Sequence, residues 1–125
     1  MFTFKNKIKK SKVDFYKILS RIYENNINSK IAGISAPSRS TTLINYLGLD
    51  ENIIEYIFEV KGSKKIGNYV PGTKIKIIEE KIQNLKKFDY LIIFSWHIKK
   101  DLIKILKKKG YKGKFIIPLP EPKII

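Results

Sequence analysis

Several residue types that carry chemistry are missing or scarce in this 125-residue chain. Cysteine is absent, which excludes disulfides, thiolate zinc sites and a cysteine nucleophile within these residues. There is one histidine, and the acidic residues do not cluster at the spacing of a metal site. We therefore expect no metal and no other cofactor in this chain.

Long apolar runs are also missing. No stretch reaches the roughly 18 residues that a membrane-spanning helix needs. The first ten residues, MFTFKNKIKK, lack the apolar core of a signal peptide. These absences predict a cytoplasmic protein without a membrane partner.

Acidic residues are few relative to basic ones: 11 Asp and Glu stand against 26 Lys and Arg, a formal net charge of +15. Such a field favours an anionic partner, whether nucleic acid, acidic lipid, a phosphorylated metabolite or an acidic protein surface. The charge does not distinguish among these partners, and a lysine-rich composition also follows from a genome poor in G and C. Residues 1–11 form a basic N-terminal lead-in, and residues 12–125 are expected to form a single domain.

What is present is an alternation of helical and apolar strand patterns. Four helices are expected: from about Ser11 to Asn26, after the Ser35–Thr42 loop up to Gly48, over 79–87 and over 98–109. Strands are expected over 31–34, in the later part of 52–60, and over 73–78, 89–95 and 114–117. The last residues, PLPEPKII, read as a Pro-rich exit. The alternation predicts an α/β fold: a Rossmann-like three-layer sandwich around a mainly parallel five-stranded sheet of order 3-2-1-4-5.

The stretch Ile31–Gly48, IAGISAPSRSTTLINYLG, organises this fold. A short apolar strand runs into small and hydroxylated residues and then into an amphipathic helix, and doubly wound sheets bind ligands at such a turn. Neither a G-x-G-x-x-G fingerprint nor a Walker A loop is present. The candidate ligand-binding residues are Ser35, Ala36, Pro37, Ser38, Arg39, Ser40, Thr41 and Thr42. The same hydroxyls would also suit a turn that only caps the helix.

Three further residues are candidates for ligand binding: Lys65, Trp96 and His97. Trp96 and His97 follow the fourth strand, at the sheet edge that also holds the Ser35–Thr42 turn. His97 is the one imidazole available for acid–base work, but no partner is visible, so a structural role is the alternative. Trp96 can stack on a base or belong to the core, and Lys65 can meet a phosphate or stay solvated. No nucleophile–base pair or carboxylate dyad is present, so no catalytic residue is assigned.

Four segments, in this order along the chain, resemble one known family. They are GISAPSRSTTLINY from Gly33, KIGNYVPGTKIKI from Lys65, DYLIIFSWH from Asp89 and KFIIPLPEP from Lys114. They are similar to the C-terminal domain of the S-adenosylmethionine-dependent sugar C-methyltransferases, whose first pattern is approximately G-x-G-A-x-A-K-G-N-T-L-L-N-Y. This chain departs from the family patterns at the edge expected to bind the ligand. One such position is Val60, where the family usually has an Asp, although Glu59 lies next to it here.

The resemblance implies a Rossmann-like domain that helps enclose a nucleotide-linked sugar. In the family, S-adenosylmethionine and the catalytic residues belong to a separate methyltransferase domain. The expected function is a stand-alone, non-catalytic module that binds a nucleotide-sugar or completes a sugar C-methyltransferase in deoxysugar or surface-polysaccharide biosynthesis. Its partners would be a phosphorylated ligand, a separate methyltransferase chain or a second copy in a homodimer. The alternative is a basic Rossmann-like domain that binds nucleic acid or another polyanion.

Overall fold

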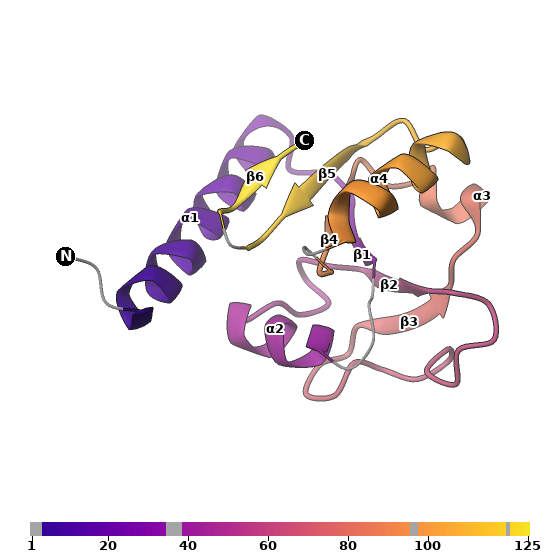
Figure 1. Ribbon diagram of the computed structural model, residues 1–125, viewed down its shortest axis with the longest axis horizontal. Helices are drawn as coiled ribbons and strands as arrows, with labels where there is room; N and C mark the ends of the chain where they lie inside the picture. The colour runs from indigo at the N-terminus through magenta and orange to yellow at the C-terminus, as the bar shows by residue number, and fades with distance from the viewer. Residues whose placement is uncertain (1–3, 35–38, 96–97, 120) are drawn as a thin grey trace.

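A six-stranded sheet forms the centre of the molecule, and its strand order is β3-β2-β1-β4-β5-β6. The computed structural model describes residues 4–34, 39–95, 98–119 and 121–125, with the backbone alone at 4, 5, 8, 39 and 40. The elements are α1 (Phe4–Asn25), β1 (Ile31–Ile34), α2 (Arg39–Leu47), β2 (Tyr56–Glu59), β3 (Lys76–Glu79), α3 (Ile82–Leu85), β4 (Tyr90–Ile93), α4 (Lys99–Lys108), β5 (Lys114–Ile117) and β6 (Lys123–Ile124) (Figure 1).

The parallel part of the sheet confirms the predicted order. The first five strands pair in parallel, and Ile34 of β1 lies level with Phe58 of β2 and Ile93 of β4. Only β6 is antiparallel, with Ile117 opposite Lys123. Short strands made of consecutive apolar residues are what a parallel sheet covered on both faces requires.

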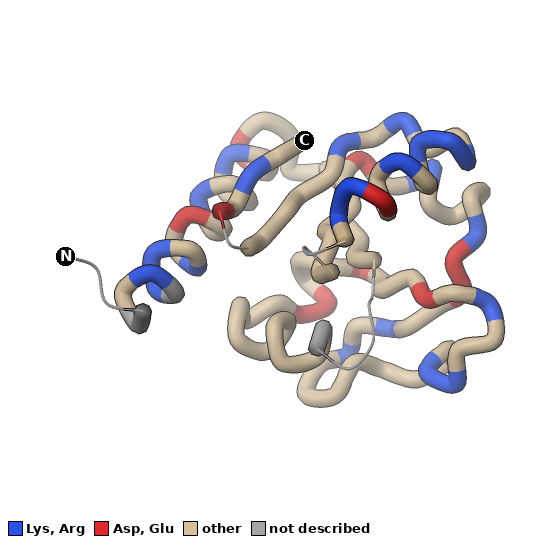
Figure 2. Tube along the Cα trace, viewed as in Figure 1, with Lys and Arg blue, Asp and Glu red and all other residues tan. Residues whose placement is uncertain are grey.

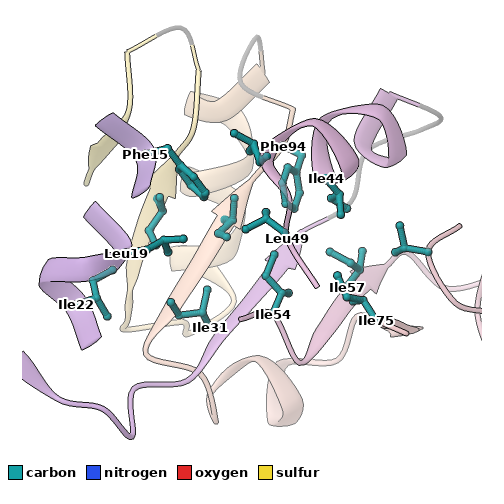
Figure 3. Close-up of a cluster of buried hydrophobic side chains, with 14 of the residues drawn as sticks. Phe15, Leu19, Ile22, Ile31, Ile44, Leu49, Ile54, Ile57, Ile75 and Phe94 are labelled. Atoms are coloured by element: carbon teal, nitrogen blue, oxygen red, sulfur yellow. The ribbon is translucent and has the colours of Figure 1, made fainter. Parts of the chain in front are cut away.

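Alternating side chains of the strands divide the core into two clusters, one on each face of the sheet. The first cluster joins strand residues to Phe15, Leu19 and Ile22 of α1 and to Ile44 of α2 (Figure 3). The second joins the other strand face to Leu85 of α3 and Leu106 of α4. Helices therefore cover both faces, and the fold is the expected three-layer α/β sandwich.

The first helix begins earlier than the sequence predicted. Its start was expected near Ser11, but α1 begins at Phe4 and includes the basic lead-in. Lysine is a good helix former, and an ion pair between Lys10 and Asp14, 2.7 Å apart at i and i+4, supports this part of the helix. The unpatterned lysines of the lead-in therefore continue the helix instead of preceding it.

The third helix was wrongly predicted over 79–87. Glu79 is the last residue of β3 and lies opposite Glu59, and α3 is a single turn over Ile82–Leu85. Strand β3 therefore continues, by pairing with β2, into residues that were expected to be helical. Pairing with a distant strand outweighs a weak local helix propensity.

The Pro-rich exit forms a sixth strand that was not predicted. Phe115 and Ile125 exchange two backbone hydrogen bonds of 2.9 and 2.8 Å, which bring the chain end back along β5. This strand satisfies backbone groups that the outer edge of β5 would otherwise leave unpaired.

Residues in two of the family-like segments form contacts that stabilise the fold. Nδ2 of Asn45 on α2 donates hydrogen bonds to the carbonyls of Thr41 (2.9 Å) and Pro71 (3.0 Å). The adjoining Gly72 has a φ of +83°, and a Cβ there would lie 2.6 Å from Oδ1 of Asn45. The turn at Pro71 and Gly72 is thus bound to α2 by a contact that leaves no space for a side chain at Gly72.

This contact predicts that Gly72→Ala destabilises the fold more than Gly62→Ala. Both glycines have a φ near +90°, but a Cβ at Gly62 meets nothing within 4 Å. We expect a shared cost of about 1 kcal/mol from the left-handed backbone and a further ~1–3 kcal/mol from overpacking at Gly72 alone. Urea unfolding of the two variants measures the difference. Equal losses at both positions would contradict the account of the Asn45 contact.

Candidate ligand-binding site

At the carboxyl edge of the sheet, the connections that follow β1 and β4 run to opposite faces. β1 and β4 are parallel neighbours, but α2 packs on the face of the first cluster and α4 on the face of the second. The chain therefore leaves the two strands towards opposite faces. In doubly wound sheets, the crevice that opens between two such connections is where ligands bind.

The predicted site residues fall partly outside the described part of the chain. Ser35, Ala36, Pro37, Ser38, Trp96 and His97 lie outside the described residues. Arg39 and Ser40 form the first turn of α2, as expected from the sequence, and are described by their backbone only. Ligand binding by all of these residues stays a prediction.

The remaining predicted residues lie in two places. Thr41 is half-buried and Thr42 exposed in the first half of α2. Lys65 is half-buried in the turn that follows β2, where its backbone N–H donates to Oγ of Ser63 (3.3 Å). Thr41 and Thr42 thus belong to the connection after β1, and Lys65 to the connection after the next strand, β2.

Glu59 is a buried carboxylate at the end of β2. Its side chain is 7% exposed, and its Oε1 has no hydrogen-bond partner. The two acids beside it are paired, since Glu79 lies 3.4 Å from Lys81 and Glu80 lies 3.4 Å from Lys109. The acidic group that the structure turns inward at this edge is therefore Glu59, whereas Val60 is exposed.

Ser95 is a second buried polar group at this edge. It follows β4, is 1% exposed, and its Oγ has no hydrogen-bond partner. Its carbonyl accepts the N–H of Ile98 (3.0 Å), so Ser95 forms the turn on which α4 begins. The N-cap residue of α4 is Ile98, which makes no side-chain cap hydrogen bond.

These two groups flank the switch point, because β1 lies between β2 and β4. A buried polar atom without a partner costs about 1–3 kcal/mol, and more if it is charged. In native proteins such groups are explained by a bound water or ion, by strain or by a functional role, so these two mark candidate positions for a ligand. Sequence reasoning assigned no role to either, although each interrupts an apolar strand: YIF before Glu59 and LIIF before Ser95.

A groove lies at the opposite, amino edge of the sheet. It has a volume of about 370 Å³ and is lined by residues at the start of β2 and β3 and by Asn84 of α3. Tyr56, Ile78 and Phe88 form its floor, and its lysines are exposed. This groove therefore lacks the buried, unpartnered polar atoms that distinguish the carboxyl edge.

The described parts of the chain hold neither a metal site nor a membrane-spanning helix. Within residues 4–34, 39–95, 98–119 and 121–125, no three side chains of His, Asp or Glu gather as metal ligands. None of the helices described there is both long and apolar enough to cross a bilayer.

The fold is a doubly wound α/β domain in which the chain leaves β1 and β4 towards opposite faces of the sheet. The chain belongs to the family described as the C-methyltransferase C-terminal domain, whose family model matches residues 1–120. It is similar to the C-methyltransferase NovU of Streptomyces niveus, with 29% identity over 98 residues. That match covers 76% of this chain and 23% of the relative, so the chain corresponds to less than a quarter of that protein.

The unpartnered hydroxyl predicts that Ser95→Ala increases the free energy of unfolding. Removing a buried donor that makes no bond should stabilise the fold by about 1 kcal/mol. Ser63→Ala is the matched control, because Oγ of Ser63 accepts the Lys65 N–H and its loss should destabilise by a similar amount. Chemical denaturation of both variants measures the two signs. A loss of stability in Ser95→Ala would show that its hydroxyl has a partner.

Proposed function

We propose that this domain is a non-catalytic module that binds the nucleotide-linked sugar on which a C-methyltransferase acts. It would work beside a methyltransferase domain, carried by the same or a separate chain, that binds S-adenosylmethionine. The class of function rests on membership of the C-methyltransferase C-terminal domain family. Because the match covers only 23% of a C-methyltransferase, the methyl-transfer chemistry is assigned to the part that this chain does not match.

The observation that carries a ligand at the carboxyl edge is the pair of unpartnered polar atoms beside the switch point. A carboxylate accepts hydrogen bonds only, so Glu59 suits the hydroxyl groups of a ribose or hexose. The amides at the start of α2 and the side chains of Arg39 and Lys65 would meet the phosphates. A nucleotide-sugar offers both kinds of group on one molecule.

The distribution of charge supports a localised ligand more than an extended polyanion. Lysine and arginine gather along α1 and α4, which cover opposite faces of the sheet, and others lie on the turns around β3 (Figure 2). Helix α2, at the proposed site, carries no charged residue from Thr41 to Leu47. Nucleic-acid binding stays the alternative, and its signature is affinity that falls steeply with salt.

Thermal unfolding in the presence of nucleotide-sugars tests the proposal. We expect dTDP-glucose or UDP-glucose to raise the melting temperature, because a ligand that binds the folded state alone stabilises it by mass action. Arg39→Ala should abolish the shift, and Glu59→Gln should reduce it. Glu55→Gln is the control, since Glu55 precedes β2 at the opposite edge and is exposed.

Two results would contradict the proposal. One is the absence of any shift with nucleotide-sugars, together with no methyltransferase chain recovered in a pull-down. The other is binding of duplex DNA, weakened steeply by salt, without any response to nucleotide-sugars, which would favour the polyanion alternative.

A further inference from the structure

The groove at the amino edge of the sheet has an aromatic floor. The rings of Tyr56 and Phe88 meet edge to face, with centroids 6.2 Å apart and planes at 89°. Phe88 is buried, and its ring also lies edge-on to that of Phe58, with a centroid distance of 5.6 Å. Tyr56 is half-buried and lines the groove. The packing behind these rings holds in place an apolar surface that suits another aromatic ring.

Two lysines flank Tyr56 on the same face of the sheet. Lys76 begins β3 and lies directly opposite Tyr56 in the pairing of β2 with β3, so both side chains lie on one face. Lys30 immediately precedes β1, which is the neighbour of β2 on its other side. Ile31 belongs to the first cluster, so the alternation of the strand puts Lys30 on the opposite face, with Tyr56. Both lysines line the groove.

The lining of the groove carries an excess of positive charge. Lys87, from the segment between α3 and β4, is the third lysine, and Glu55 is the acid among the lining residues, so three lysines and one glutamate give a formal charge of +2. Within the described residues none of the three lysines forms an ion pair. Ammonium groups that lack a carboxylate partner favour an anionic ligand.

Two neutral polar groups also lack partners in the groove. The side chains of Tyr56 and Asn84 are half-buried, and neither makes a hydrogen bond to another described residue. The phenol and the amide can both donate and accept. The groove therefore combines an apolar floor with a small number of polar groups, as small-molecule sites do.

The size of the groove limits the ligand. Its volume of about 370 Å³ lies near the lower end of the range of small-molecule sites, about 300–1,000 Å³. A single ring with a small substituent suits this volume better than a nucleotide-linked sugar, which carries a base, two sugars and two phosphates.

We infer that this groove binds a small aromatic anion, a single aromatic ring that carries a carboxylate or a phosphate. The ring packs on Tyr56 and Phe88. The anionic group meets the ammonium groups of Lys30, Lys76 and Lys87. The inference does not rest on the proposed function, because the groove lies at the amino ends of β2 and β3 and the proposed nucleotide-sugar site lies at the carboxyl edge. The domain then holds two ligands, one at each edge of the sheet.

Titration with benzoate and with phenyl phosphate, followed by amide chemical shifts, tests this site. We expect both compounds to shift the resonances of Tyr56, Ile78 and Phe88. Inorganic phosphate, which lacks the ring, and phenol, which lacks the charge, should each bind at least tenfold more weakly. Lys76→Gln should weaken the binding of phenyl phosphate by about tenfold, the value of one charge-assisted hydrogen bond. Tyr56→Phe, which keeps the ring, should bind more tightly than Tyr56→Leu.

Lys74→Gln is the matched control, because it removes the same charge from an exposed residue two positions before Lys76 that does not line the groove. Equal weakening by Lys74→Gln and Lys76→Gln would overturn the inference, since only net charge would then matter. Inorganic phosphate that binds as tightly as phenyl phosphate would also overturn it, because the aromatic floor would have no role. So would displacement of phenyl phosphate by UDP-glucose, which would assign the groove to the nucleotide-sugar.

Discussion

The parallel pairing of β1 with β4 is the constraint on which the rest of the structure depends. Four residue pairs, from Ile31 opposite Tyr90 to Ile34 opposite Ile93, hold the two strands together. Gly33 lies within this pairing, and a Cβ there would come within 2.5 Å of Ile57 and 2.6 Å of Phe94. A side chain at position 33 would therefore disturb the contacts around β1, which lies between β2 and β4. The chain leaves β1 and β4 towards helices on opposite faces of the sheet, which is the arrangement of a switch point.

The carboxyl edge combines costs that a purely structural protein would avoid. Glu59 and Ser95 bury polar atoms without partners. Each of these features lowers stability in the absence of a ligand, and each can be offset by a complementary group of a ligand. The hydroxyl groups of a sugar would complement both, which supports the proposed function.

Sequence patterns predicted the layers and the strand order because buried parallel strands consist of short runs of apolar residues. Strand β5 was predicted to the residue, over Lys114–Ile117. The start of α1, the shortness of α3 and the presence of β6 were missed, since each depends on pairing or packing with distant residues. At the site, topology predicted the edge, but Glu59 and Ser95 emerged only from burial and hydrogen bonding. Binding by the Ser35–Thr42 turn, Lys65, Trp96 and His97 stays a prediction.

Amide chemical-shift mapping during titration with a nucleotide-diphosphate sugar tests the central claim most directly. If the ligand occupies the switch-point crevice, the largest shifts will come from the carboxyl edge, at Ile34, Glu59 and Lys99. If the largest shifts instead come from Tyr56 and Phe88, the ligand binds the groove at the amino edge and the account of the site is wrong.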